Sequence, residues 1–420
     1  MPALLQSLLQ ALLSPVLALV LACSALAGPW LLSSSPVLAL SDAQQLVVEA
    51  WRLVNQSYVD PAQFEQVQWK RLRQKALEQA IQSSEDAYRA IDAMLAPLAD
   101  PYTRLLRPSE YSDLQSNTQG SVMGVGLQLG LRSPDQQVVV IAPLDGSPAA
   151  EAGISSGMVV QAVDGQATAE LGLEGTASRL RGPSGSEVLV QLVSPDGRRV
   201  EHSLQRRQVD LQPVRSKRLR SGEHTLGYLR ITQFAEPVSE QVHQALEDLS
   251  GKGIEGLILD LRNNSGGLVS AGLAVADQLL GGDPIVTTAG RDGLSSPVQA
   301  NPARVYDGPL LTLVNGGTAS ASEILAGALQ DDGRSLLAGS QTFGKGLIQS
   351  LIPLGDGSGL AVTVARYLTP SGRDIQHQGI TPDEALSGSE PLNPGADDDG
   401  WLAQAQRLLV QQLEIELGTA

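Results

Sequence analysis

The chain has 420 residues, enough for two or three domains with a sizeable core. Its net charge of −16 argues against a nucleic-acid partner, because binding to phosphate backbones depends on basic patches. A single cysteine, Cys23, excludes an internal disulfide, and together with four scattered histidines it leaves no zinc-site spacing, so the sequence predicts no metal and no cofactor.

The first 40 residues are apolar and small, with no acidic residue before Asp42 and no basic residue before Arg52. This composition predicts a secretory signal peptide with an Ala-x-Ala cleavage site at residues 25–27, although the usual basic start is missing. An uncleaved membrane anchor and a lipid attached to Cys23 are the alternatives. In each case we expect the rest of the chain to be exported across a membrane.

Residues 41–117 carry apolar side chains at three- and four-residue steps, a spacing typical of amphipathic helices. The segment from Asp100 to Arg104 contains a proline and is interpreted as a turn. We therefore predict an N-terminal helical region that packs on the core, and we assign no chemistry to its residues.

In residues 118–206, strand-like runs such as 138–141 lie between glycine-containing turns, and this pattern predicts a small β-rich module. Between residues 207 and 385, strands alternate with helical segments, which indicates an open α/β core. Residues 386–420 are expected to be a mobile linker followed by an amphipathic helix. The predicted fold class is α/β, with an inserted β-domain and an N-terminal helical region.

Two strands of the predicted core end in a glycine-marked break before a helix. One break is residues 263–267, which read Asn-Asn-Ser-Gly-Gly, and the other follows the apolar strand at residues 310–314. Open α/β sheets bind ligands at such strand ends, which favours an active site there. A helix cap with a flexible turn is the alternative.

Ser320 lies at the second break, where the strand passes into a helix. Such a junction exposes a side chain beside the free backbone N–H groups of the helix start, which suits a nucleophile. Glu323 follows three residues later, so a capping box alone would also explain the serine.

Lys345 lies between Gly344 and Gly346 and is the candidate base for that serine. A lysine accepts a proton only when neutral, and burial lowers its pKa below the free value of about 10.4. Gln349 could hold the amine by a hydrogen bond without adding a charge that would raise this pKa. The alternative is a phosphate-binding loop, which residues 339–345 nearly match, but the required Ser or Thr is missing at position 346.

Residues 315–349 as a whole resemble the active-site block of carboxyl-terminal processing proteases, the PDZ-containing serine proteases of the tail-specific family. The resemblance is carried by Ala-Ser-Ala-Ser-Glu at 319–323, by Thr-Phe-Gly-Lys-Gly at 342–346, and by the spacing between them. It implies that Ser320 is the nucleophile, that Lys345 is the general base, and that Gln349 orients the lysine.

The break at residues 263–267 is similar to the family's Leu-Arg-Asn-Asn-Pro-Gly-Gly, with Ser265 in place of the proline. The resemblance implies an oxyanion hole made of the backbone N–H groups of Gly266 and Ala321. Such donors stabilise the tetrahedral oxyanion, and losing one typically costs about 100- to 1000-fold in rate.

The β-rich module resembles a PDZ domain, which captures an extended peptide by strand addition and grips its terminal carboxylate. The carboxylate loop is expected at Met123, Gly124, Val125, Gly126 and Leu127, with a simple β-turn as the alternative. In relatives, an arginine of a later loop of the module, which is residues 180–185 here, couples the ligand-filled PDZ domain to the protease core. That residue corresponds to Arg181 here, and a solvated turn residue is the alternative.

The resemblance covers residues 41–383 and is nearest to the branch that trims the photosystem II reaction-centre precursor in oxygenic phototrophs. It implies a ClpP/crotonase-like core and a Ser/Lys endopeptidase that removes C-terminal extensions from proteins with exposed C-termini, in the thylakoid lumen or the periplasm. It leaves open a membrane-associated substrate and the oligomeric state. Two other hypotheses remain: a catalytically silent PDZ scaffold or chaperone, and a crotonase-like acyl-CoA enzyme.

Overall fold

The computed structural model describes residues 40–132, 137–144, 146–155, 157–391 and 393–418. The predicted signal peptide, including Cys23 and the cleavage site at residues 25–27, lies outside the described residues. Across the described ranges, no helix is both long enough and apolar enough to cross a membrane.

The described chain begins with a group of short helices, as its periodicity predicts. They are α2 (Asp42–Ser57), α3 (Gln63–Gln66), α4 (Trp69–Leu77), α5 (Ser84–Leu95) and the 3-10 helix η1 (Ala96–Leu98). Their apolar faces share one hydrophobic core with the strand β19 (Gly359–Leu368), which contributes Leu360 and Val362. The turn at residues 100–103 then leads into β1 (Arg104–Leu106), which pairs with β19, and into α6 (Pro108–Thr118).

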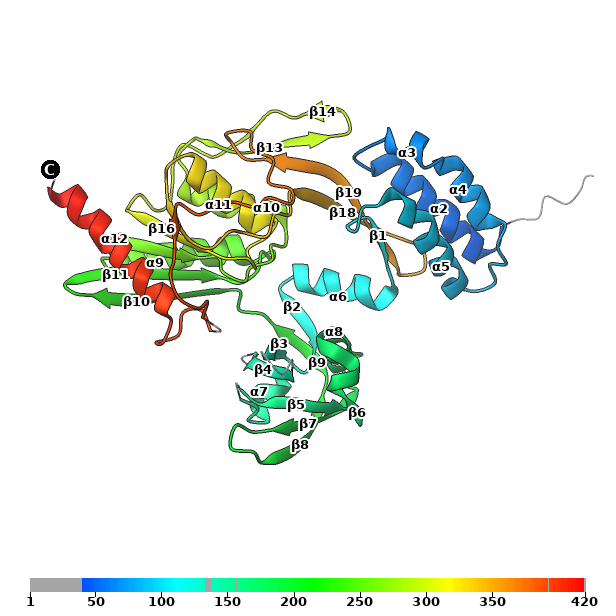
Figure 1. Ribbon diagram of the computed structural model, residues 1–420, viewed down its shortest axis with the longest axis horizontal. Coiled ribbons are helices and arrows are strands. Elements are labelled where there is room, and N and C mark those ends of the chain that lie inside the picture. The colour runs from blue at the N-terminus through cyan, green and yellow to red at the C-terminus, as the bar shows by residue number, and fades with distance from the viewer. Residues whose placement is uncertain (1–39, 133–136, 145, 156, 392, 419–420) are drawn as a thin grey trace, which may run out of the picture. The chain divides into compact units, whose positions relative to one another are not determined.

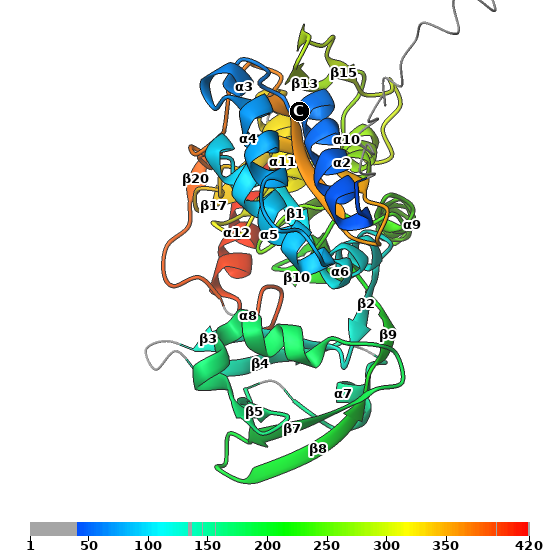
Figure 2. The ribbon, with the colours of Figure 1, turned by 90° about the vertical axis from the view of Figure 1, so that its right-hand side faces the viewer.

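The β-rich module follows α6 (Figure 1). Its antiparallel sheet has the strand order β3-β4-β5-β7-β8, with β6 on β5. These strands are β3 (Leu127–Arg132), β4 (Gln137–Pro143), β5 (Val159–Val163), β6 (Gln166–Ala167), β7 (Glu187–Val193) and β8 (Arg199–Gln205), and the helices are α7 (Pro148–Glu151) and α8 (Thr168–Leu180). Figure 2 shows α8 lying across this sheet, where Leu180 joins the buried core of the module.

The chain enters and leaves the module through one two-stranded ladder. In it β2 (Ser121–Gly124) pairs antiparallel with β9 (Arg207–Asp210), so that Ser121 lies opposite Asp210. Because both ends of the module meet at this ladder, the module is an insertion into the surrounding α/β fold.

The α/β core is built on a six-stranded sheet of order β10-β11-β12-β16-β17-β20, parallel except for the β10–β11 pair. The strands are β10 (Val214–Ser221), β11 (His224–Ile231), β12 (Gly256–Asp260), β16 (Leu310–Val314), β17 (Leu336–Gly339) and β20 (Glu384–Ala385). The runs that form β12 and β16 are buried along their whole length, as expected for strands covered on both faces. The predicted α/β class is confirmed.

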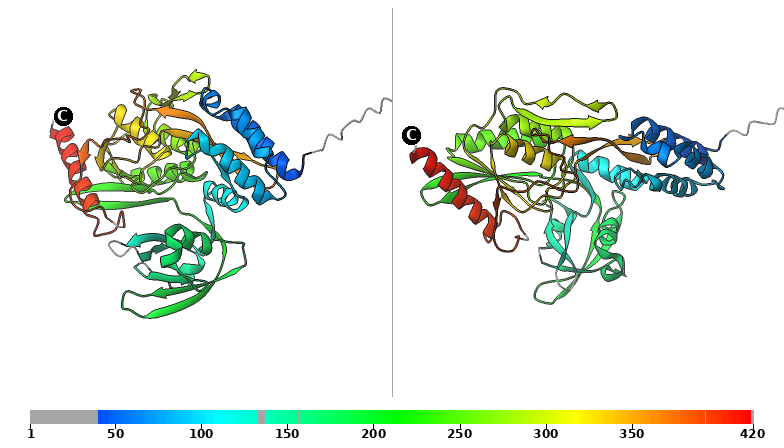
Figure 3. Two further views of the ribbon diagram at one scale, coloured as in Figure 1. Left: turned by 45° about the vertical axis from the view of Figure 1, so that its right-hand side comes forward. Right: turned by 45° about the horizontal axis from the view of Figure 1, so that its top comes forward.

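Helices cover both faces of this sheet. On one face lie α9 (Val238–Gly251), α10 (Val269–Leu279) and α11 (Ala321–Asp331), whose apolar residues form the largest hydrophobic core. On the other lies α12 (Gly400–Gly418), which packs Leu402 and Leu409 on Ile258 and Leu311 (Figure 3). The helix α12 lies in the segment for which the sequence predicts an amphipathic C-terminal helix.

A second sheet joins the N-terminal helices to the core. Its order is β1-β19-β13-β14, with β15 on β13 and β18 on β19. The strands not yet named are β13 (Pro284–Gly290), β14 (Gly293–Leu294), β15 (Val298–Gln299) and β18 (Leu347–Pro353). The strand β19 packs Leu360 among the N-terminal helices and, at its other end, Tyr367 in the core of α10 and α11. One strand therefore connects the segment around residue 102 with the segment around residue 345.

Candidate active site

Ser320 lies between the buried strand β16 and the buried helix α11. Its backbone is in an unusual conformation, with φ at 57° and ψ at −119°, and the residue is 9% exposed. Non-glycine residues rarely adopt positive φ, and such strain costs on the order of 1–3 kcal/mol and persists where the surroundings over-determine it. The fold therefore holds this serine in one particular orientation.

The capping pattern of Ser320 and Glu323 is present at the start of α11. The backbone N–H of Ser320 donates to Glu323 Oε2 at 2.9 Å, as in a capping box. The N–H of Glu323 donates in turn to the carbonyl oxygen of Ser320 at 2.8 Å. The start of α11 is therefore satisfied through the backbone of Ser320.

Glu323 is fully buried and links the serine segment to the lysine segment. Its Oε2 accepts the backbone N–H of Ser320 and that of Lys345, each at 2.9 Å. Its Oε1 accepts the Gly344 N–H at 2.8 Å and the Thr342 hydroxyl at 2.5 Å. A buried carboxylate needs such donors to compensate for lost hydration, so these four bonds fix both segments around one side chain.

Tyr367, on β19, links the same two residues from the carbonyl side. Its hydroxyl lies 3.1 Å from the carbonyl oxygen of Ser320 and 2.9 Å from that of Lys345. Burial, assisted by the nearby Glu323 charge, raises the pKa of Tyr367 well above its ordinary value, so the hydroxyl stays protonated and can donate. The backbones of Ser320 and Lys345 are thus brought together by two buried side chains, of which the sequence analysis assigned Glu323 only a capping role and Tyr367 no role.

The Lys345 side chain is half-buried, and its Nζ lies 5.1 Å from the centre of the Tyr102 ring. Burial lowers the pKa of this lysine, the Arg104 charge lowers it further, and the Glu323 charge opposes both. The net direction is the one that a lysine base requires. Among the described residues, no hydrogen bond joins Lys345 Nζ to the Ser320 hydroxyl.

The phosphate-loop alternative for Lys345 is wrong. That motif requires a helix directly after the lysine, with its N–H groups directed at the phosphates. The chain instead continues into the strand β18, which pairs with β19 from Leu347 onward.

The glycine break after β12 lies directly against the serine. A Cβ placed on Gly266 would come within 2.8 Å of the Ser320 Cβ and 3.1 Å of the Ala321 backbone nitrogen. The predicted oxyanion-hole pair, Gly266 and Ala321, is therefore adjacent in space. The N–H of Gly266 donates at 2.9 Å to the side chain of Asn264, a partner that the sequence analysis did not foresee.

Gln349 lies in β18, four positions beyond Lys345 in the chain. Its Nε2 is buried and has no hydrogen-bond partner within the described part of the chain. The hydrogen bond to Lys345 implied by the family resemblance is therefore not formed in this structure, and the donor remains available.

The predicted carboxylate loop of the module spans the end of β2 and the start of β3. Val125 is buried, and Gly124 lies against the end of α8, where an added Cβ would come within 2.9 Å of the Leu180 carbonyl oxygen. Arg181 follows Leu180, and its side chain forms an ion pair at 3.1 Å with Asp113 of α6. Arg181 thus connects the end of α8 in the module to α6, the helix that precedes the module in the chain.

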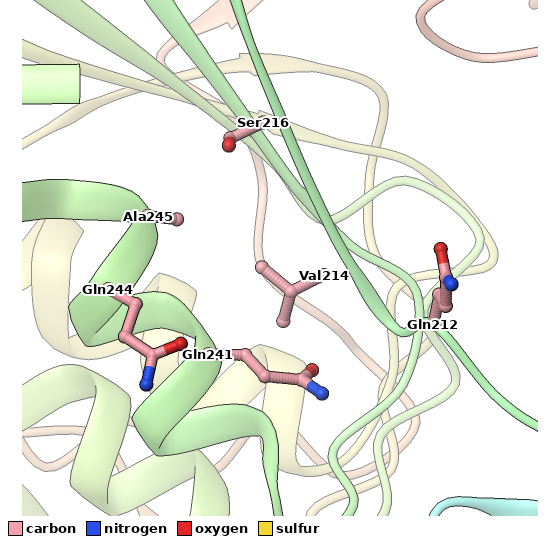
Figure 4. A pocket seen from close by; sticks show the side chains of 6 residues that line it. All are labelled: Gln212, Val214, Ser216, Gln241, Gln244 and Ala245. Carbon is pink, nitrogen blue, oxygen red and sulfur yellow. The ribbon is translucent and has the colours of Figure 1, made fainter. Parts of the chain in front are cut away.

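A cavity of about 1120 Å³ in the described chain is lined by residues of β10, of β11 and of the segment after β20, and its lining includes Asn263 of the glycine break but neither Ser320 nor Lys345. A cavity of about 420 Å³ lies between β10 and α9. Figure 4 shows its lining of Gln212, Val214, Ser216, Gln241, Gln244 and Ala245, none of which the sequence analysis selected. No group of three His, Cys, Asp or Glu side chains in the described ranges is arranged to hold a metal ion.

Sequence reasoning missed Tyr102, Tyr367 and Asn264, and it assigned Glu323 only a capping role. The signal for Tyr102 was present as the Asp-Pro-Tyr-Thr-Arg segment at residues 100–104, which was interpreted as structural. No local pattern marks Tyr367, because its contacts come from residues 22 and 47 positions away.

Comparison with known proteins gives consistent matches. Residues 225–386, which include Gly266, Ser320, Lys345 and Gln349, match the model of peptidase family S41. A carboxyl-terminal-processing protease of Synechocystis sp. is 45% identical over 89% of this chain and 87% of its own length. Carboxyl-terminal-processing peptidase 2, chloroplastic, of Arabidopsis thaliana is 41% identical over 86% of this chain and 72% of its own length.

Solved structures are similar over the same extent. A photosystem II D1 C-terminal processing protease is 39% identical in sequence and matches with a TM-score of 0.62 over 88% of this chain and 98% of that chain. The similarity therefore includes the N-terminal helices and the β-rich module, beyond the span of the family model.

Proposed function

Because this chain belongs to peptidase family S41 and is a carboxyl-terminal-processing serine peptidase, we propose that Ser320 is its nucleophile and Lys345 its general base. The observation that carries this assignment is the shared acceptor Glu323 Oε2, which binds the backbone N–H groups of both residues at 2.9 Å. A buried carboxylate that holds a strained serine beside a desolvated lysine suits a catalytic pair better than two independent structural roles.

In the acylation step, Ser320 Oγ attacks the carbonyl carbon of the scissile peptide bond, and its proton passes to the neutral Lys345 amine. The tetrahedral intermediate then collapses, the C–N bond breaks, and the Lys345 ammonium gives its proton to the leaving amine. Water attacks the resulting ester while Lys345 again accepts a proton. The second tetrahedral intermediate collapses, the C–O bond to Ser320 breaks, and the Lys345 ammonium returns the proton to Ser320 Oγ. The products are a new C-terminal carboxylate, the released C-terminal peptide and the restored serine.

The backbone N–H groups of Gly266 and Ala321 would stabilise the oxyanion of both intermediates. For this, the Gly266 N–H has to exchange the Asn264 side chain for the oxyanion, since it donates to Asn264 Oδ1 in the resting structure. Gln349 would position the lysine, because its buried Nε2 donor has no other partner among the described residues. An amide suits this position because it adds no charge to stabilise the ammonium.

The β-rich module would act as a PDZ domain that captures the C-terminus of the substrate at Met123–Leu127. Its strand topology and its insertion through the β2–β9 ladder support this role. The Arg181–Asp113 ion pair gives the module a polar connection to α6, which agrees with a coupling role for Arg181.

The substrate we propose is the precursor of the photosystem II reaction-centre protein, or a protein with a similar exposed C-terminal extension. The support is the solved D1 C-terminal processing protease, together with a chloroplastic relative. We further propose that the mature chain acts in the thylakoid lumen or the periplasm, as the apolar first 40 residues suggest.

The proposal is tested by incubating the protein with a peptide that carries the precursor's C-terminal extension and identifying the products by mass spectrometry. We expect one cleavage that releases the extension, and no cleavage by Ser320→Ala. Substrate binding without turnover would instead support the scaffold hypothesis. Peptides that end in an amide in place of the carboxylate test the PDZ role, because they should be cut more slowly at low concentration.

A further inference from the structure

The turn at residues 100–103 is firmly attached to the strand that leads to the candidate site. Asp100 accepts the Tyr102 N–H at 2.9 Å and the Thr103 hydroxyl at 2.7 Å. Thr103 Oγ1 in turn accepts the Thr363 N–H of β19 at 3.0 Å. Arg104, the next residue, begins β1, which also pairs with β19. This turn therefore presents the Tyr102 ring in a fixed place, although it lies outside the span of the peptidase model.

The ring lies against the lysine that we assign as the base. Lys345 Nζ is 5.1 Å from the ring centre, within the distance at which an ammonium group is attracted to the negative face of an aromatic ring. This attraction requires the positive charge and is lost when the amine becomes neutral. The contact is thus selective for one protonation state of the lysine.

Other charged and titratable groups also face Lys345. Arg104 from β1 repels the ammonium, and Glu323 from α11 attracts it. Tyr367 from β19 contacts only the backbone carbonyl of the lysine. Among the described residues named here, Tyr102 is the one in direct contact with the side-chain nitrogen.

We propose that Tyr102 is a positioning residue that holds the Lys345 ammonium in a resting position, from which the neutral amine departs to reach Ser320. The proposal rests on the assignment of Lys345 as the base. It also accounts for the unpartnered Gln349 Nε2, because the lone pair of a neutral amine can accept that donor whereas an ammonium cannot. Loss of the proton therefore weakens the contact with Tyr102 and at the same time creates an acceptor for Gln349.

The pH dependence of cleavage distinguishes this role from simple packing. The acid limb of the kcat/KM profile reports the pKa of the base in the free enzyme. Replacing the ring in Tyr102→Leu removes a stabilisation of the ammonium, so we expect this limb to move to lower pH by about 0.5 to 1 unit. The matched control Tyr102→Phe keeps the ring face, and its profile should coincide with that of the unmodified protein.

A second measurement does not depend on turnover. In the Ser320→Ala background, the rate at which acetic anhydride modifies Lys345 is followed against pH by peptide mass spectrometry, with and without Tyr102→Leu. We expect the midpoint to shift downward by the same amount as the acid limb. An unchanged midpoint in a folded Tyr102→Leu protein would overturn the proposal.

The assignment of Lys345 as the base and the assignment of Tyr102 as its resting contact can be refuted independently. Full cleavage by Lys345→Ala would remove Lys345 as the base, while the modification midpoint would still report whether Tyr102 holds its ammonium. Conversely, an inactive Lys345→Ala protein together with an unmoved midpoint would leave the dyad intact and exclude the resting position.

Discussion

Arg262 and Asp399 lie 137 residues apart in the chain and form a buried two-contact ion pair, with Nη2–Oδ2 at 2.6 Å and Nη1–Oδ1 at 3.1 Å. Arg262 also donates to Asp260 at the end of β12, and Asp399 accepts the Leu402 N–H at the start of α12. The pair therefore ties the C-terminal helix to the loop that carries Gly266. The C-terminal segment is thus part of the support of the candidate oxyanion hole.

Removing the Asp399 charge should destabilise the protein strongly, because the buried guanidinium of Arg262 then keeps only the Asp260 carboxylate of its two charged partners. For Asp399→Asn we expect the free energy of unfolding, measured with urea, to fall by about 3 kcal/mol. The neighbouring Asp398 is exposed, so Asp398→Asn should change the free energy of unfolding by no more than about 0.5 kcal/mol. Equal effects of the two substitutions would contradict the role of the pair.

The same pair makes stability depend on acid pH. Burial raises the pKa of Asp399, but hydrogen bonds from Arg262 and from the backbone N–H groups of Gly395 and Leu402 outweigh it and lower the pKa below its ordinary value. A carboxyl with a depressed folded pKa contributes stability above its unfolded pKa and loses it as the pH falls through the folded value. The stability gap between the unmodified protein and Asp399→Asn should therefore narrow as the pH is lowered below about 4.

Glu323→Gln should impair catalysis without weakening substrate binding. The amide can offer only one acceptor oxygen to four donors, so the segments of Ser320 and Lys345 lose part of their shared attachment. Because small displacements of catalytic groups cost on the order of 100-fold in rate, we expect kcat to fall by about that factor while KM changes little. The exposed Glu247→Gln on α9 is the control, with both constants unchanged. A rise in KM at constant kcat would assign Glu323 to substrate binding instead.

Lys345→Met should yield an inactive protein that is more stable than the original at neutral pH. The pKa of Lys345 is lowered by burial and by Arg104, so the folded state binds its proton less tightly than the unfolded state. The resulting penalty is complete below the folded pKa and disappears as the pH rises to the unfolded value near 10.4. We therefore expect the unfolding free energy of Lys345→Met to exceed that of the unmodified protein at pH 7, and the difference to shrink by pH 10.

The exposed Lys252→Met, from the surface pair with Asp248, controls for the general effect of a lost charge. This substitution should change the free energy of unfolding by less than about 0.5 kcal/mol at either pH, and it should leave the rate of cleavage unaffected. A Lys345→Met protein that is less stable at pH 7 would show that the ammonium is stabilised where it lies.

The parts of this site that the sequence could predict are those that local patterns specify. The apolar run at β16, the glycines after it and the helical spacing of α11 predict the junction that holds Ser320, since each depends on neighbours in the chain. Tyr102 and Lys345 meet only because β1 and β18 both pair with β19, which no periodicity reveals. Glu323 illustrates a different difficulty, because its local capping pattern is real and conceals the three bonds it accepts from the lysine segment.

Gly266→Ala should disable the oxyanion hole while leaving most of the fold intact. The residue has φ at +99°, and an added Cβ would lie 2.8 Å from both the Ser320 Cβ and the Ala319 carbonyl oxygen, so the loop must move away from the serine. We expect kcat for peptide cleavage to fall by about 100- to 1000-fold, the loss typical of one oxyanion donor.

Gly333→Ala is the matched control, because φ is +67° there and no atom lies within 4 Å of the added Cβ. It carries the same kind of backbone strain without the contact, and its kcat should be unchanged. An undiminished kcat in Gly266→Ala would remove this loop from the catalytic machinery.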